Sequence, residues 1–163
     1  MSQRIVINAT DFAREAGLLQ GKLPTASLTR TLDLLADPAG VLSYEVEGCF
    51  GSRKGPQLVV SVEGTLSVCC KRCLEGIDYP LSVHSVLEFI GIEEELTQEE
   101  IEDDSRDFLT EQNEVDVIAL IEDEVILDLP VAPRHDSCAL PEAWQGSENA
   151  SPFSVLKGLK SKA

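Results

Sequence analysis

The sequence contains few basic residues, few aromatic residues and few histidines. Thirteen Lys and Arg oppose 29 Asp and Glu, which gives a formal net charge of −16 at pH 7. Proteins that bind nucleic acid through a broad basic face have the opposite balance, so any contact with RNA is confined to a small patch. Aromatic residues make up only 5% of the 163 residues and hydrophobic residues 43%, which predicts one domain with an aliphatic core.

The sequence also lacks the motifs of the common enzyme classes. It has no Gly-rich phosphate loop, no serine nucleophile motif and no metalloprotease helix, and it contains only two His. Carboxylates are abundant, but a run such as Glu93 to Glu95 is more typical of a solvated surface than of acid–base catalysis. We therefore expect a protein that is not an enzyme. A thiol oxidoreductase remains an alternative, and a nuclease is less well supported.

Neither a signal-like segment nor an apolar run of membrane length is present in the sequence. The chain has five Cys, two of them adjacent, and this odd number argues against a disulfide framework. These features predict a protein of the reducing cytoplasm that makes no contact with a membrane.

The acidic residues are concentrated in one part of the chain. Residues 88–128 contain 17 Asp and Glu and a single basic residue, Arg106, whereas the rest of the chain contains 12 residues of each sign. A chain divided in this way has a neutral part and an acidic part, and we expect the two to do different work.

Three stretches alternate between apolar and polar residues with the period of two that is typical of a strand with one buried face. They begin at Leu42, Leu58 and Leu81, and the residues from Gly51 to Pro56 predict a tight antiparallel connection between the first two. We expect an α+β fold built on an antiparallel β-meander or a partly closed, barrel-like sheet, extended by residues 5–7. Two short N-terminal helices are predicted near residues 11–15 and 28–35.

The second half of the chain predicts helical structure. Thr97 and Glu100 have the spacing of a capping box, although the acidic residues that follow are also compatible with a mobile loop. Residues 115–129 repeat apolar side chains at helical spacing and end at Pro130. Glu122 falls inside the apolar arc of that helix, and we favour an Arg partner or a side chain that extends to solvent over a functional carboxylate.

These elements predict four parts along the chain. They are a mainly β domain with a Cys-x-x-Cys turn (1–92), an acidic linker or helix (93–114), a helix with a Pro/His/Cys segment that packs on the sheet (115–140), and a tail (141–163).

Cysteines at a turn suggest a metal site. Cys70 and Cys73 lie in a Cys-x-x-Cys turn between the second and third strands, and His135 and Cys138 follow the prolines. Together they offer the ligand types of a tetrahedral Zn²⁺ site. Two other interpretations stay open: the thiols are inert, or Cys70 and Cys73 form a redox pair whose thiol pKa is lowered by neighbouring basic residues.

Four segments of the sequence resemble one family. Residues 68–74 read V-C-C-K-R-C-L, residues 116–130 read D-V-I-A-L-I-E-D-E-V-I-L-D-L-P, residues 131–138 read V-A-P-R-H-D-S-C, and residues 152–160 close the pattern. The chain resembles the bacterial YceD family, known as large ribosomal RNA subunit accumulation proteins. The resemblance implies a role in the synthesis, processing or stability of 23S ribosomal RNA, without known catalytic activity. Its recognisable residues are Cys70, Arg72, Cys73, Asp116, Glu122, Asp123, Glu124, Pro130, Pro133 and His135. Some relatives carry further cysteines after the proline motif, whereas this chain has only Cys138 there.

An acidic protein with such a role needs a partner that tolerates its charge. We expect an adaptor whose acidic segment recognises a basic protein, either a ribosomal protein or an RNA-processing factor, close to large-subunit ribosomal RNA that it contacts directly or indirectly. A small zinc-binding module is the alternative. The spacing of Phe153, Leu156 and Leu159 suits a short helix that docks on a partner or on its own domain. The residues expected to bind partners are Lys71, Arg72, Asp116, Glu122, Asp123, Glu124, Phe153, Leu156 and Lys160.

Overall fold

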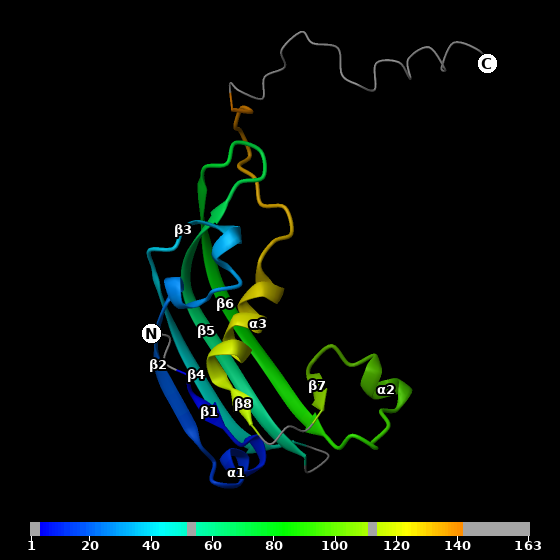
Figure 1. The fold of residues 1–163 in the computed structure, drawn as a ribbon. Helices are drawn as coiled ribbons and strands as arrows, with labels where there is room; N and C mark the ends of the chain where they lie inside the picture. Colours follow the sequence, from blue (N-terminus) through cyan, green and yellow to red (C-terminus); the bar gives the residue numbers. More distant parts are fainter. Residues whose placement is uncertain (1–3, 52–54, 111–113, 142–163) are drawn as a thin grey trace, which may run out of the picture.

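The computed structural model describes residues 4–51, 55–110 and 114–141. Within these ranges the fold is α+β, with one large mixed sheet and few helices (Figure 1). The sheet has the strand order β2-β4-β5-β6-β7, and β3 pairs with β5 beside this path. Its strands are β2 (Leu18–Pro24), β3 (Leu35–Asp37), β4 (Val41–Phe50), β5 (Pro56–Cys69), β6 (Gly76–Ile90) and β7 (Asp107–Thr110).

The centre of the sheet is the antiparallel meander β4-β5-β6, which confirms the three predicted strands. Val62 of β5 pairs with Tyr44 of β4 and with Val83 of β6, so apolar side chains of all three strands point to the same face. Leu42, Val46 and Val60 are fully buried on that face. On the opposite face, β4 exposes the polar side chains of Ser43, Glu45 and Glu47. The sheet therefore has one packed face and one largely solvated face.

Helix α3 (Val117–Asp128) covers the packed face (Figure 1). Val117, Ile121 and Val125 recur every four residues, so they share one side of the helix, and all three are fully buried in the core. Asp116 caps the helix, because its Oδ1 accepts hydrogen bonds from the backbone N–H groups of Ile118 and Ala119 at 3.1 and 3.3 Å. The predicted helix over 115–129 is thus confirmed with slightly shorter bounds.

The N-terminal region differs in part from the prediction. Helix α1 (Ala9–Arg14) is close to the predicted position and is capped by Asn8, whose Oδ1 accepts from the N–H of Asp11. The helix predicted over 28–35 is wrong: after the 3₁₀ turn η1 (Thr25–Ser27), the chain there forms a second 3₁₀ turn, η2 (Leu32–Leu34), and then enters β3. The N–H of Arg30 is directed to the Glu122 carboxylate and not to a helical carbonyl.

Residues 5–7 do not extend the meander, which corrects a second expectation. Strand β1 (Val6–Ile7) pairs instead with β8 (Val115–Asp116), in a small antiparallel sheet. The edge of β4 is occupied by β2, a strand that was not predicted. The N–H of Val117 donates to the carbonyl of Ile5 at 2.9 Å, so residue 5 is held at the beginning of α3.

The acidic segment after β6 is partly ordered into regular structure. Helix α2 (Gln98–Ile101) begins with the predicted capping box, in which Thr97 and Glu100 each bond the other's backbone N–H. The chain then returns as β7, which pairs with β6 in parallel. The described strands therefore form an open, mixed sheet and not the purely antiparallel meander or partly closed barrel that was expected.

Candidate functional site

The Cys-x-x-Cys turn and the segment after α3 meet at one end of the sheet. The turn joins β5 to β6, and residues 130–141 run from the end of α3 toward it (Figure 1). The N–H of Lys71 donates to the carbonyl of Pro133 at 2.8 Å, which joins the two segments directly. All four predicted metal ligands come together here, and no other group of this kind occurs in the ranges that the structure describes.

The four side chains form a compact thiol–imidazole cluster, defined as Cys70, Cys73, His135 and Cys138. The Sγ atoms of Cys70 and Cys138 lie 3.9 Å apart, and the Sγ of Cys73 lies 3.3 Å from Nδ1 of His135. All four candidate ligand atoms lie within 4.8 Å of one another. The cysteines are free thiols, so the cluster is not held by a disulfide.

The backbone of the turn is wound around Cys70. The N–H of Arg72 donates to its Sγ at 3.4 Å, and the N–H of Leu74 donates to its carbonyl at 3.0 Å. Leu74 adopts a left-handed conformation with φ +66°, which costs a non-glycine residue about 1–3 kcal/mol. The rest of the turn therefore compensates for a strained residue next to Cys73.

The cluster has a polarised charge distribution. Burial opposes ionisation of Cys70, but N–H donors of Cys73, Arg72 and His135 lower its pKa to about 5. The pKa of Cys73 is raised to about 11: a hydrogen bond with the backbone of Glu75 favours its thiolate, but burial and the other two sulfurs outweigh it. A hydrogen bond to Cys70 raises the pKa of His135. The metal-free cluster thus holds a thiolate beside an imidazole that is more basic than usual.

The remaining cysteines lie outside the cluster. Cys69 Sγ contacts the carbonyl of Leu74 at 3.7 Å, and Cys49 Sγ contacts Oε1 of Gln57 at 3.8 Å. Burial, with a smaller effect of Glu47, raises the pKa of Cys49. Neither thiol has the surroundings of a ligand or of an activated nucleophile.

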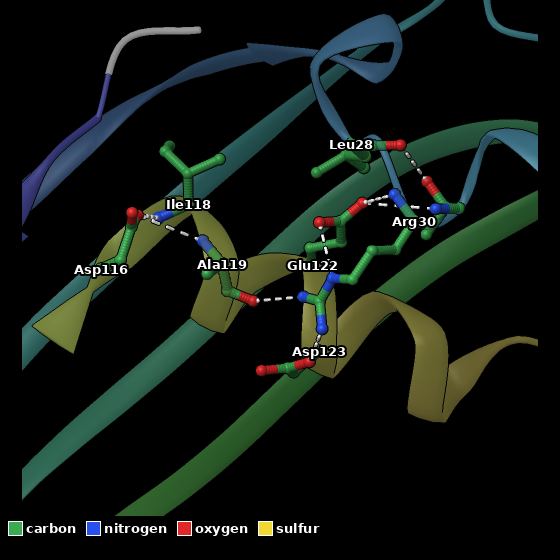
Figure 2. A network of polar contacts seen from close by, with 8 residues as sticks. Leu28, Arg30, Asp116, Ile118, Ala119, Glu122 and Asp123 are labelled. Carbon is green, nitrogen blue, oxygen red and sulfur yellow. Dashed lines mark hydrogen bonds and ion pairs between the residues drawn. The ribbon is translucent and has the colours of Figure 1, made fainter.

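Glu122 lies at the centre of a second polar network (Figure 2). Glu122 is only 5% exposed, and both of its carboxylate oxygens accept hydrogen bonds from Arg30. The backbone N–H of Arg30 donates to Oε1 at 2.6 Å, and the side-chain Nε of Arg30 donates to Oε2 at 3.0 Å. Arg30 also donates to Asp123 at 2.5 Å and to the carbonyl of Ala119 at 2.9 Å. Glu122 and Asp123 raise the pKa of Arg30. The network explains why a carboxylate lies in the apolar arc of α3.

A groove of about 710 Å³ lies between α3 and β7. Its lining combines apolar side chains with carboxylates, and among the residues that the structure describes Arg4 is the only basic one in it. The apolar lining includes Leu87, Phe89, Phe108, Leu120, Ile126 and Leu127, and the carboxylates are Asp107, Glu114, Asp116, Asp123 and Glu124.

Glu124 is the most enclosed of these carboxylates. It is a buried residue, and the hydroxyl of Ser85 donates a hydrogen bond to its Oε2. Burial raises the pKa of Glu124, the Ser85 bond opposes this rise, and the charges of Asp107 and Asp123 add to it. A buried carboxylate without a basic partner among these contacts is destabilising when it is ionised.

The other predicted partner-binding residues are distributed over the molecule. Lys71 and Arg72 are exposed beside the thiol–imidazole cluster, and Asp116 caps α3 and pairs with Arg4 at 2.9 Å. Phe153, Leu156 and Lys160 lie outside the described residues. The Arg partner expected for Glu122 is confirmed and is Arg30, which no local pattern could identify because it lies 92 positions away in the sequence.

The fold and these sites define a small α+β protein that carries a thiol–imidazole cluster at one end of its sheet and a carboxylate-lined groove toward the other. The chain belongs to the YceD family: the family model described as "Large ribosomal RNA subunit accumulation protein YceD" matches residues 58–160. The match starts within β5 and includes the whole cluster and α3. The family description links the protein to the accumulation of large-subunit ribosomal RNA. No solved structure matches the chain significantly. No helix in the described ranges has the length and apolar character needed to cross a membrane.

Proposed function

We propose that this protein is a non-enzymatic ribosome biogenesis factor that supports the accumulation of 23S ribosomal RNA by binding a basic protein. The observation that carries this proposal is the groove between α3 and β7, in which an apolar lining is combined with five carboxylates of the described residues. A partner that fills it needs apolar side chains flanked by Lys or Arg. Ribosomal proteins and RNA-processing factors are basic because they bind RNA, and they have segments of this kind.

The apolar part of the groove supports a protein partner over a free RNA strand. Leu127 of α3 is 77% exposed and lines the groove beside Ile126, so part of the apolar surface is available to a partner. Phosphate groups would be repelled by Asp107 and Glu114, which are exposed there. An amphipathic helix or extended segment with basic flanks would cover the apolar surface and would be attracted by these carboxylates.

The acidic residues around α2 strengthen the same preference. α2 precedes β7 by a short connection, residues 102–106, and β7 lines the groove. Glu93, Glu95, Glu99 and Asp104 are exposed in this segment. Their summed field attracts a basic partner over distances comparable to the Debye length, about 8 Å at physiological salt, and steers its approach.

The opposite end of the sheet is the better candidate for contact with RNA. Lys71, Arg72 and Arg134 are exposed around the β5–β6 turn, with Glu75 and Asp136 nearby. Strand β5 has 14 residues, which corresponds to roughly 45 Å between its ends. A protein bound in the groove and RNA at the turn would occupy separate regions, which is the arrangement that an adaptor needs.

The test compares co-purified molecules with and without ribonuclease. Tagged protein is recovered from growing cells at low salt, and the bound proteins and RNA are identified. The proposal expects a basic protein that stays bound after the RNA has been digested. If every protein contact disappears together with the RNA, the groove is not the binding site and the interaction runs through RNA.

Matched charge reversals locate the binding surface. Asp107→Lys with Glu114→Lys changes the groove, and Glu47→Lys with Glu63→Lys makes the same change of charge on the solvated face of the sheet. The groove variant is expected to lose at least about tenfold in affinity and to lower 23S levels. The control variant should retain both. Equal losses in the two variants would contradict a specific groove.

A further inference from the structure

We propose that Cys70, Cys73, His135 and Cys138 bind one structural Zn²⁺ ion. The proposal goes beyond the groove and does not depend on the identity of any partner.

The distances within the cluster agree with a tetrahedral zinc site. Zn–S bonds of about 2.3 Å and Zn–N bonds of about 2.0 Å place two sulfurs about 3.8 Å apart, and a sulfur and a nitrogen about 3.5 Å apart. The Cys70 and Cys138 sulfurs are separated by 3.9 Å, and Cys73 Sγ lies 3.3 Å from His135 Nδ1. These two separations match the site, and all four ligand atoms lie within 4.8 Å of one another. A disulfide would need a sulfur separation of about 2.05 Å.

The imidazole of His135 has the orientation of a metal ligand. Its Nε2 lies 3.2 Å from the carbonyl of Gly76, so the proton of the neutral ring is held on Nε2. The lone pair of Nδ1 is then directed at Cys73 and toward the other sulfurs. Ligating histidines in proteins usually donate their second N–H to a carbonyl or carboxylate in this way.

The segment that carries His135 and Cys138 lies on the surface of the protein. None of residues 130–141 is buried, and Val131 is 98% exposed. Its contacts with the β5–β6 turn include the Lys71–Pro133 backbone bond, the His135–Gly76 contact and the cluster itself. A cross-link to the β5–β6 turn would order such an exposed segment, and a metal ion provides one.

The ligand set defines the kind of site. Four protein ligands leave no open position for water or substrate, so the ion would be structural and not catalytic. Three thiolates and a neutral imidazole around Zn²⁺ carry one net negative charge, which the neighbouring Lys71 and Arg72 offset. Binding releases the thiol protons to solvent.

Metal analysis tests the proposal directly. The full chain is purified with a reductant and without a chelator, and zinc is measured per chain for the wild type, Cys138→Ser, and the matched control Cys69→Ser. The wild type and the control are expected to contain about one equivalent, and Cys138→Ser to lose most of it. Less than about a tenth of an equivalent in the wild type, with no uptake of added Zn²⁺ by the reduced protein, would overturn the site.

Cobalt substitution keeps the test valid if the Cys138 variant does not fold. Co²⁺ is titrated into reduced, metal-free wild type and into Cys69→Ser. Both should give the intense absorption of tetrahedral cobalt with thiolate ligands, and Zn²⁺ should displace it. Absence of these bands, or a disulfide between Cys70 and Cys138 found by mass spectrometry of protein kept under reductant, would overturn the proposal. Neither result depends on partner binding, so failure here leaves the proposed function untouched.

Discussion

At the residue scale, Arg30 is the contact on which the buried Glu122 depends. The Arg30 side chain is half exposed, whereas Glu122 is almost fully enclosed and accepts from both the backbone and the side chain of Arg30. Removal of the guanidinium leaves a buried carboxylate with backbone donors only. Loss of every donor to a buried carboxylate lowers the free energy of unfolding by several kcal/mol. The cost here is smaller, because the backbone donors to Glu122 remain.

We therefore predict that Arg30→Met lowers the free energy of unfolding by about 2 kcal/mol. Chemical denaturation measures the change. Arg14→Met is the matched control, because Arg14 pairs with Asp11 in an exposed ion pair and its loss should cost less than about 0.5 kcal/mol. The double variant Arg30→Met, Glu122→Leu should recover part of the loss. Equal effects at positions 30 and 14 would contradict the role given to the network.

Glu124 gives a prediction on pH. Its pKa is raised in the folded protein, so the folded state holds this proton more tightly than the unfolded state does. Stability from this group is fully present below the unfolded pKa and decreases as the pH rises through the folded pKa. Glu124→Gln keeps an acceptor for Ser85 and removes the buried charge, so at pH 7 to 8 it should be more stable than the wild type by about 1 kcal/mol.

The measurement is the free energy of unfolding from pH 4 to pH 8. The gain of Glu124→Gln should shrink toward acidic pH, where the wild-type carboxyl is itself protonated. Glu47→Gln, at an exposed position on the other face, should change little at any pH. A gain that does not vary with pH would show that burial of the charge is not its cause.

At the element scale, the sequence predicted the parts of the fold that have a strong local pattern. Strands β4, β5 and β6 alternate over ten or more residues, and the capping box and the prolines mark α2 and the end of α3. Strand β7 has four residues within an acidic segment, and its parallel pairing with β6 depends on a crossover that no local pattern encodes. The groove could not be predicted because it exists only once β7 lies beside α3.

The two halves of the thiol–imidazole cluster could also be predicted, because each has a strong local pattern. Cys-x-x-Cys and His-x-x-Cys are each short local patterns at turns, and only their meeting required the fold. Arg30 shows the opposite case, because nothing in its neighbourhood indicates a partner on α3. Local patterns therefore located the candidate metal site, whereas the contact that holds Glu122 and the groove came from tertiary structure.

The segment 130–138 provides a prediction on metal removal. The core beneath α3 is formed by residues outside this segment, so loss of zinc should release the segment without unfolding the sheet. Chelator treatment should speed proteolysis around Arg134 at least about tenfold and change the circular dichroism little. Cys69→Ser should respond as the wild type does. Protection that is independent of chelator would show that the segment is held by protein contacts alone.

The exposed end of α3 gives a prediction on the groove. Leu127 lines it and is 77% exposed, so Leu127→Ser should weaken partner binding by about 1–2 kcal/mol with little change in melting temperature. Leu18→Ser is the matched control, since Leu18 is 58% exposed on β2, away from the groove. Binding by titration calorimetry and melting curves separate the two effects. Equal binding by both variants would exclude the apolar lining as a contact surface.

At the scale of the whole molecule, the two ends of the sheet differ in the charge that they expose. The residues around α2 and β7 are strongly acidic, whereas the β5–β6 turn exposes both basic and acidic side chains. The match to the family model includes both regions. The proposed adaptor would meet its partner in two stages: the acidic field would guide the encounter, and the groove would then hold the bound segment.

These two stages can be separated by kinetics, because long-range attraction acts on association and desolvated contacts act on dissociation. Reversing Glu93, Glu95, Glu99 and Asp104 to Lys should lower the association rate by about tenfold or more at low salt, and added salt should bring this variant and the wild type together. Leu127→Ser should instead raise the dissociation rate and keep the wild-type salt dependence. Surface plasmon resonance with the captured partner at several salt concentrations measures both rates. If the charge reversals changed only the dissociation rate, the acidic segment would be part of the contact surface itself, and attraction at a distance would have no role in the encounter.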